Sequence, residues 1–172
     1  MGASARALAG IETRPATGDD AAAIAFAHID SIRTLGPHFY PADVVEAWCE
    51  GLTADIYAKA MRGGEAFFIA TGRLDGQHVV LGFATHRVDD EQDGASVYVR
   101  GRAARQGIGT ALLRLAEQHA RAHGATSIQI QASLAGVTFY KVNGFEELGR
   151  SEAMLMSGKS IACVLMRKQL RA

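Results

Sequence analysis

Apolar residues recur along this chain with two different periods, and each period predicts one kind of element. Within residues 21–35 they return at helical spacing, which places Ile24, His28 and Leu35 on one face of a helix. Short apolar runs and alternating apolar and polar residues, as in 127–132, indicate strands. Glycine, proline and acidic residues separate these segments. The pattern therefore predicts strands and helices in alternation from residue 11 onward.

Specific elements follow from these periods. Helices are predicted over 21–35, over 41–61 with an interruption at Gly51, over about 108–123 and over 135–142. Strands are predicted over 11–16, 66–71, 79–88, 95–100, 127–132, 147–156 and 161–168. Asp75-Gly76 predicts a hairpin turn, and residues 89–94 predict a polar turn.

The order of the elements predicts an α/β (α+β) fold. Strands that follow one another directly favour antiparallel pairing. Between residues 97 and 131 a strand, a helix and a strand form a β-α-β unit, which favours a parallel pair. We therefore expect a mixed, mostly antiparallel twisted sheet of about seven strands with a central parallel pair, flanked by helices on both faces.

Composition narrows the class of protein. With 172 residues, 48% of them hydrophobic and 21% charged, the chain can bury one core, so we expect a flexible tail over 1–10 and a single domain over 11–172. Basic and acidic residues balance at 18 each, which gives no support to a nucleic-acid or membrane partner. The sequence has no apolar stretch as long as a membrane span and only two cysteines, so we expect a cytoplasmic protein.

The segment 97–113 carries the densest chemical signal. A strand runs into a loop, and a helix begins at Gly107 and Gly109. A helix N-terminus presents unpaired N–H groups, and glycines let a ligand approach the backbone, which is typical of a phosphate site. A dinucleotide fingerprint is disfavoured because its third glycine is replaced by Leu112, and a P-loop is excluded because no lysine precedes Thr110.

This segment resembles the acetyl-CoA pyrophosphate loop of the GNAT superfamily, whose usual form is Gln/Arg-x-x-Gly-x-Gly/Ala after a hydrophobic strand. Gly107-x-Gly109 matches both glycines, while the Gln/Arg position is Ala104, flanked by Arg102 and Arg105. Because such a loop binds mainly through main-chain N–H groups, the resemblance holds despite that departure.

A second block downstream is also similar to the family. Residues 132–145 follow a strand, contain Phe139-Tyr140 and end in Gly144-Phe145, like the late segment of GNAT members. The two blocks occur in the family's order and are spaced by one helix and one strand. One further departure is Gly101, which stands where many members carry a proline after the strand.

The resemblance implies an N-acetyltransferase that moves an acetyl group from acetyl-CoA to a primary amine by direct attack in a ternary complex. It implies that Tyr140 is a general acid beside the CoA sulfur. Backbone groups of Val97 and Val99, in the strand before the glycine loop, would bind the pantetheine arm and polarise the acetyl carbonyl. No metal is expected. The residues expected to bind acetyl-CoA are Val97, Tyr98, Val99, Arg105, Gln106, Gly107, Ile108, Gly109 and Thr110.

The general base and the acceptor are left open. His86, Glu91, Asp93 and a water chain are candidate bases, and His86 has the most suitable ordinary pKa. The acceptor is expected to be a small-molecule or peptide amine. The resemblance also implies an acceptor pocket built from the first two helices and the last strands. An aromatic cluster there either lines that pocket or packs the second helix; its members are His38, Phe39, Tyr40 and Trp48.

Other interpretations compete with this one. His119 and His123 have a spacing that can bind zinc, but no third ligand is evident. Ser133 lacks the GxSxG surroundings of a hydrolase nucleophile. A catalytically inactive acyl-CoA sensor of the same fold and a binding protein for another phosphate ligand remain alternatives. Since dimers are common in the family, a homodimer is also among the expectations.

Overall fold

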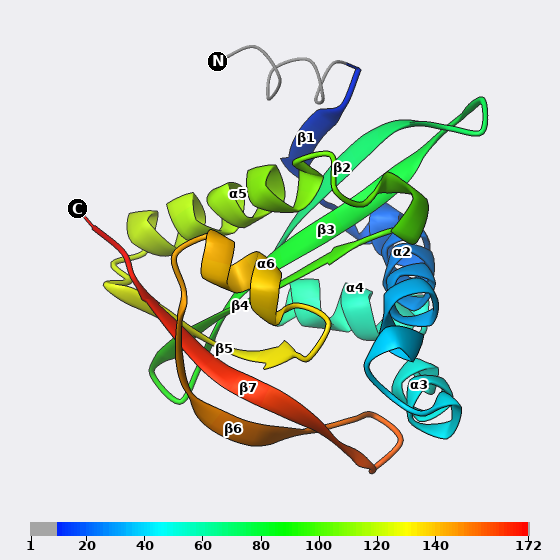
Figure 1. Cartoon of the computed structure of the whole chain (residues 1–172). Coiled ribbons are helices and arrows are strands. Elements are labelled where there is room, and N and C mark those ends of the chain that lie inside the picture. Colours follow the sequence, from blue (N-terminus) through cyan, green and yellow to red (C-terminus); the bar gives the residue numbers. More distant parts are fainter. Residues whose placement is uncertain (1–9, 172) are drawn as a thin grey trace.

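The computed structural model describes residues 10–171, and Figure 1 traces their helices and strands. The strands are β1 (Glu12–Pro15), β2 (Ala66–Leu74), β3 (Gln77–Asp89), β4 (Gln92–Val99), β5 (Ser127–Ser133), β6 (Glu146–Met154) and β7 (Ser160–Gln169). The helices are α2 (Ala21–Leu35), α3 (Ala42–Cys49), α4 (Ala54–Arg62), α5 (Ile108–Ala122) and α6 (Val137–Val142), with short 3-10 turns η1 (Gly18–Asp20), η2 (Gly36–His38) and η3 (Gly101–Ala103). The predicted tail over 1–10 lies outside the described residues except for Gly10.

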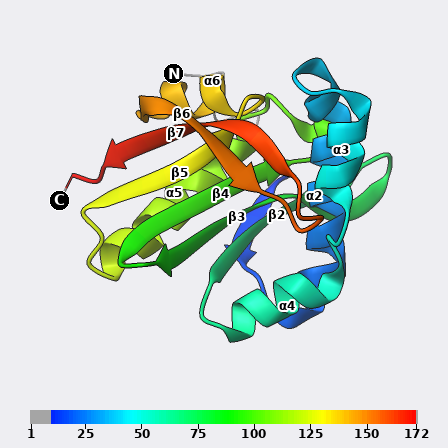
Figure 2. The ribbon, with the colours of Figure 1, turned by 90° about the horizontal axis from the view of Figure 1, so that it is seen from below.

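The strands form two antiparallel sheets that meet at β4 and β5. The first sheet has the order β1-β2-β3-β4, and the second has the order β5-β7-β6. β4 and β5 lie side by side (Figure 1, Figure 2), but no ladder joins them within residues 10–171. The α/β (α+β) class is therefore confirmed, whereas the expected parallel pair is not a hydrogen-bonded pair.

Alternating side chains of the first sheet explain why helices cover both of its faces. On β2, Phe67 and Ile69 pack with residues of α2 and α4, while Phe68 and Ala70 pack with residues of α5. Successive strand residues point to opposite faces, so a strand buried on both sides reads as a continuous apolar run.

In the described part of the chain, no helix has the length and apolarity needed to cross a membrane.

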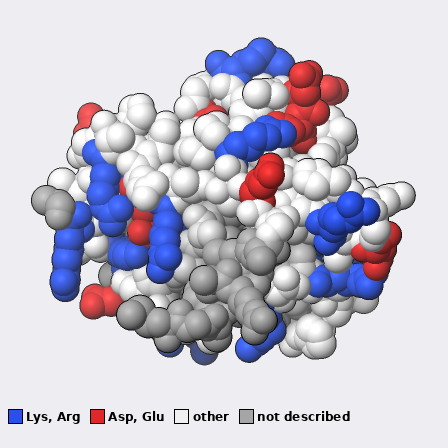
Figure 3. All heavy atoms as spheres, turned by 90° about the horizontal axis from the view of Figure 1, so that it is seen from above, with Lys and Arg blue, Asp and Glu red and all other residues white. Residues whose placement is uncertain are grey.

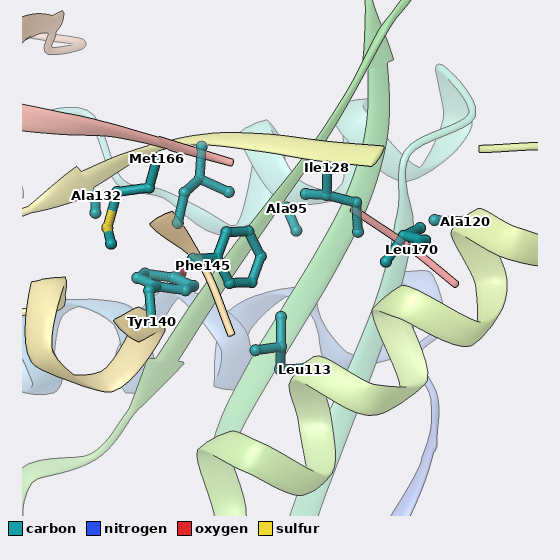
Figure 4. Packing of buried hydrophobic residues seen from close by; sticks show 10 residues of the cluster. Ala95, Leu113, Ala120, Ile128, Ala132, Tyr140, Phe145, Met166 and Leu170 are labelled. Carbon is teal, nitrogen blue, oxygen red and sulfur yellow. The ribbon is translucent and has the colours of Figure 1, made fainter. Parts of the chain in front are cut away.

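Helix α5 lies in the junction between the two sheets. Its residues Ile108, Leu112 and Ala116 belong to a cluster with β2 and β3. Its residues Leu113 and Ala120 belong to a second cluster with α6, β5 and β7, which Figure 4 shows from close by. The helix therefore buries two stripes of residues, one against the first sheet and one against the second.

Two turn predictions have different outcomes. Asp75 (φ 51°) and Gly76 (φ 80°) form the predicted hairpin turn between β2 and β3. The polar turn expected over 89–94 is shorter: Asp90 (φ 48°) and Glu91 (φ 61°) make the turn, and β4 already begins at Gln92. A two-residue turn of left-handed residues matches the twist of the flanking strands, so the polar residues that follow can pair in the ladder.

Candidate functional site

The first turn of α5 presents free backbone donors at the protein surface. Gly107 is the N-cap with a left-handed φ of 83°, and no side chain caps the helix. The first helical bond runs from the Ala111 N–H to the Gly107 carbonyl, at 3.1 Å. The N–H groups of Ile108, Gly109 and Thr110 therefore have no partner within the helix, and the positive end of the dipole lies with them. This geometry suits an anion, as the sequence predicts.

The two glycines of this turn serve different purposes. Gly107 needs its left-handed φ, and a Cβ there would meet nothing within 4 Å, so the space above it is open to a ligand. A Cβ on Gly109 would lie 3.0 Å from the ring of Phe139 on α6. Gly109 therefore lets α6 approach α5, and the two sequence blocks that resemble the family are in contact.

Of the arginines near this turn, Arg105 is the one available to a bound anion. Arg102 pairs with Asp75 in the β2–β3 hairpin. The guanidinium of Arg100 lies over the ring of Phe26, at 4.7 Å. Arg105 is exposed, has a φ of 63°, and has no acidic partner among residues 10–171. It can supply the cation that Ala104 lacks.

Basic side chains elsewhere on the surface lie beside acidic ones. Figure 3 shows the molecule from above, with several groups of blue side chains next to red ones. On that face the charges are mixed and form no continuous basic field.

The backbone of β4 directs alternate groups toward β5. The Arg100 N–H bonds to the Leu81 carbonyl at 2.8 Å, which makes Tyr98 and Phe83 the next hydrogen-bonded pair of the β3–β4 ladder. The same alternation turns the N–H and C=O groups of Val97 and Val99 away from β3, into the junction with β5. The Val97 N–H donates to the Tyr140 hydroxyl at 3.1 Å. Main-chain groups of β4 therefore face the space where the two sheets meet.

Tyr140 brings a buried phenol to this junction. Its ring lies in the cluster of Figure 4, 5.3 Å from the ring of Phe145. Burial, together with nearby Tyr98, raises the pKa of Tyr140, while the hydrogen bond from the Val97 N–H acts in the opposite direction. The hydroxyl stays protonated at neutral pH and accepts from Val97, so its own proton is free to be donated to another group.

Tyr98 occupies the opposite face of the sheet. Its backbone pairs with Phe83 on β3, and its ring contacts that of His28 on α2, with centroids 3.8 Å apart and ring planes tilted by 43°. Burial raises the pKa of Tyr98 to about 12. The structure brings Val97, Val99 and Tyr140 together, but the main chain of Tyr98 points away from them.

Two of the candidate bases, His86 and Asp93, lie within hydrogen-bond distance of each other. His86 is buried on the α5 side of the sheet, and both of its ring nitrogens have partners: Nε2 lies 2.6 Å from Asp93 Oδ1, and Nδ1 lies 2.9 Å from His119 Nδ1. Glu91 is an exposed residue of the hairpin turn. His119 stacks on His123, and residues 10–171 contain no group of three or more potential ligands arranged for a metal ion. The histidines tie the β3–β4 hairpin to α5.

The aromatic cluster divides into buried and exposed members. Tyr40 and Trp48 are buried, whereas His38 and Phe39 are exposed. The Tyr40 hydroxyl donates to the Ala162 carbonyl at 2.6 Å and accepts from the Leu134 N–H at 2.9 Å. Tyr40 thereby joins the end of β5 to β7, so at least one member of the cluster packs the fold.

Asp30 is a polar residue near the site that the sequence analysis does not single out. Its carboxylate accepts a hydrogen bond from the Gly101 N–H at 2.9 Å, between α2 and the start of η3. The two residues are far apart in sequence, so no local pattern predicts the contact.

Comparisons with known proteins identify the family and the fold. Residues 29–145 match the acetyltransferase (GNAT) family. A GCN5-related N-acetyltransferase from Rhodopseudomonas palustris is similar over 94% of this chain and 96% of its own, with 27% identity and a TM-score of 0.79.

Two more distant structures share the fold and contain the coenzyme. The PaiA N-acetyltransferase of Thermoplasma acidophilum, in complex with coenzyme A, has 18% identity and a TM-score of 0.71 over 92% of this chain and 98% of its own. YncA of Salmonella typhimurium, with its cofactor acetyl-CoA, has 19% identity and a TM-score of 0.68 over 94% of this chain and 95% of its own. Among curated proteins, none has a sequence that matches this chain.

Proposed function

The chain belongs to the acetyltransferase (GNAT) family, and we propose that it transfers an acetyl group from acetyl-CoA to a primary amine, using a single domain over residues 11–172. The observation that carries the proposal is the hydrogen bond between the Val97 N–H and the Tyr140 hydroxyl, in the junction that begins just before the uncapped N-terminus of α5. Main-chain donors for a phosphate and a proton donor for a thiolate thus belong to one continuous stretch of the fold.

Each part of acetyl-CoA has a counterpart in this stretch. The pyrophosphate would bind the N–H groups of Ile108 to Thr110 and the Arg105 guanidinium, with Gly107 leaving room for it. The pantetheine arm would follow the main chain of Val97 and Val99. The adenosine end would lie toward a cavity of about 380 Å³ between α5 and α6, which is lined by Leu113, Arg114, Glu117, Val142, Asn143, Gly144 and Lys168.

Tyr140 supplies the acid step in this proposal. The amine nitrogen attacks the acetyl carbonyl, the carbon–sulfur bond breaks, and the Tyr140 hydroxyl gives its proton to the departing thiolate. The Val97 N–H stabilises the phenolate that this leaves. Because both nitrogens of His86 are engaged, we assign removal of the amine proton to water.

One observation favours a second candidate. Ala104 stands where the family usually has Gln or Arg, which is compatible with an acyl-CoA-binding protein that does not catalyse transfer. A panel of small primary amines and peptides, assayed for CoA thiol release from acetyl-CoA, separates the two. Amine-dependent release supports the enzyme, whereas binding of acetyl-CoA without release for any amine favours the inactive binder.

A further inference from the structure

One face of α2 contacts the segment between β4 and the first turn of α5, at Arg100 and Gly101. Phe26, Asp30 and Thr34 stand four residues apart, so they lie in one row along the helix. Phe26 is 58% exposed, yet it carries the Arg100 guanidinium on its ring. Asp30 accepts the Gly101 N–H at 2.9 Å, and its other oxygen lies 3.9 Å from Arg100 Nε. We call these three residues the α2 row.

Gly101 is shaped for this contact. A Cβ at Gly101 would lie 2.5 Å from side-chain atoms of Thr34, which is too close for any residue other than glycine. Helix α2 therefore packs directly on the backbone of Gly101. The resemblance to the family expects proline at this position, and proline has no N–H to donate. In this chain a hydrogen bond across to α2 takes the place of the ring that would otherwise restrict the backbone.

The contact is transmitted to the N-terminus of α5 through a short and well-packed segment. Gly101 begins η3, and its carbonyl accepts the Ala104 N–H at 3.3 Å. Ala103 is buried in the same cluster as Ile108 and Leu112 of α5. The segment between the Asp30 carboxylate and the N–H groups that follow Gly107 is therefore short and held by packing, so the position of one restricts the position of the other.

We propose that Asp30 is a positioning residue for acyl-CoA binding: through the Gly101 N–H it fixes the entry to the 101–107 loop and so orients the donors of α5 before the ligand arrives. This proposal rests on the proposed function, because it assumes that the loop binds CoA. Fixing a loop in its bound conformation raises affinity by removing the entropy that ordering would cost.

The charge of Asp30 makes the proposal testable. A carboxylate close to a phosphate site opposes binding of the anion, so removing the charge alone should strengthen binding of CoA. The hydrogen-bond acceptor is what the proposal requires. Asp30→Asn keeps an acceptor oxygen without the charge, whereas Asp30→Ala removes both. A positioning role therefore predicts weaker binding of CoA in Asp30→Ala and no weakening in Asp30→Asn.

The experiment measures the dissociation constant of CoA by calorimetry for the wild type, Asp30→Ala and Asp30→Asn. Asp43→Ala is the matched control, because the exposed Asp43 carboxylate on α3 makes no ion pair with any described residue. Hydrogen exchange of the amides of residues 102–110 is followed in the ligand-free proteins. We expect Asp30→Ala to bind CoA about tenfold more weakly and to exchange faster in this loop, while Asp30→Asn and Asp43→Ala stay near the wild type.

Each outcome has one meaning. Equal weakening in Asp30→Ala and Asp30→Asn, or no weakening in Asp30→Ala with slow loop exchange, overturns the positioning role. If the wild type itself fails to bind CoA, the proposed function falls, and the Asp30 proposal falls with it. Asp30→Asn provides the comparison in a folded protein even where Asp30→Ala proves unstable in thermal unfolding.

Discussion

At the residue scale, the proposed chemistry depends most on a single hydroxyl. Tyr140 accepts from the Val97 N–H and has its proton free, so Tyr140→Phe removes the proposed acid but keeps the ring in its cluster. We expect turnover to fall about 100-fold with little change in the affinity for acetyl-CoA. The rate of thiol release with the best amine of the panel measures this.

The control for Tyr140→Phe is another buried tyrosine. Tyr57 bonds to His28 at 2.8 Å and lies in the cluster between α2 and α4. Tyr57→Phe loses a buried hydroxyl of the same kind outside the junction, and we expect its turnover to stay near that of the wild type. Equal turnover in Tyr140→Phe and the wild type would remove Tyr140 from the mechanism.

His28 makes the stability of the fold depend on pH. Burial lowers the pKa of His28 to about 3, so the folded protein keeps this side chain neutral where the unfolded chain, with a pKa near 6.5, takes up a proton. Stability is unaffected above about pH 6.5 and falls as the pH drops from there toward 3, by about 1.4 kcal/mol per pH unit. Urea unfolding at pH 7.5 and 5 should show a smaller loss for His28→Gln than for the wild type; an identical loss would contradict this assignment.

Sequence reasoning suggests some residues of the proposed site and gives no sign of others. Gly107, Gly109 and Tyr140 lie in local sequence patterns with a clear chemical meaning. Asp30 does not, because its partner Gly101 is brought to it only by the packing of α2 on the sheet. His86 is of a residue type that often acts as a general base, but in the fold its two ring nitrogens lie within hydrogen-bond distance of Asp93 and His119.

At the scale of elements, the contact between α5 and α6 can be tested with Gly109→Ala, whose effect on the free energy of unfolding should change sign when Phe139 is made smaller. A Cβ at Gly109 would lie 3.0 Å from Phe139, so Gly109→Ala should destabilise the protein by about 1–2 kcal/mol. In a Phe139→Leu background the space opens, and the helix preference of alanine over glycine should make Gly109→Ala stabilising, by up to about 1 kcal/mol. Denaturant unfolding of the four proteins of this cycle provides the measurement. Gly109→Ala stabilising the protein even with Phe139 present would show that the two helices do not press on each other.

The elements themselves could be predicted where their period is clear. α2 spans Ala21–Leu35, as its apolar spacing predicts, and the hairpin at Asp75-Gly76 forms as its turn chemistry predicts. α5 shows the limit of this reasoning. The spacing identifies one buried stripe, but the burial of Leu113 and Ala120 depends on the second sheet, which no local pattern describes.

At the scale of the whole molecule, the proposed site depends on the separation of the two sheets at β4 and β5. A β-α-β unit predicts that β4 and β5 pair, and they do lie side by side. The Val97 N–H, however, is taken by Tyr140 from α6, so a side chain from a third element stands where a ladder would run. The central claim is that this junction and the first turn of α5 together bind acyl-CoA.

The most direct test of that claim is thermal unfolding with and without acetyl-CoA, beside NAD and ATP. At about 100 times its dissociation constant, a ligand bound only by the folded state adds about 2.7 kcal/mol of stability. We expect acetyl-CoA alone to stabilise the wild type, and Gly107→Glu to lose the effect because it places a charge in the phosphate site. Gly124→Glu is the matched control, since it carries the same left-handed strain at the other end of α5 and should still respond. Absence of any stabilisation by acetyl-CoA at about millimolar concentration, or equal stabilisation of Gly107→Glu and the wild type, would contradict the account.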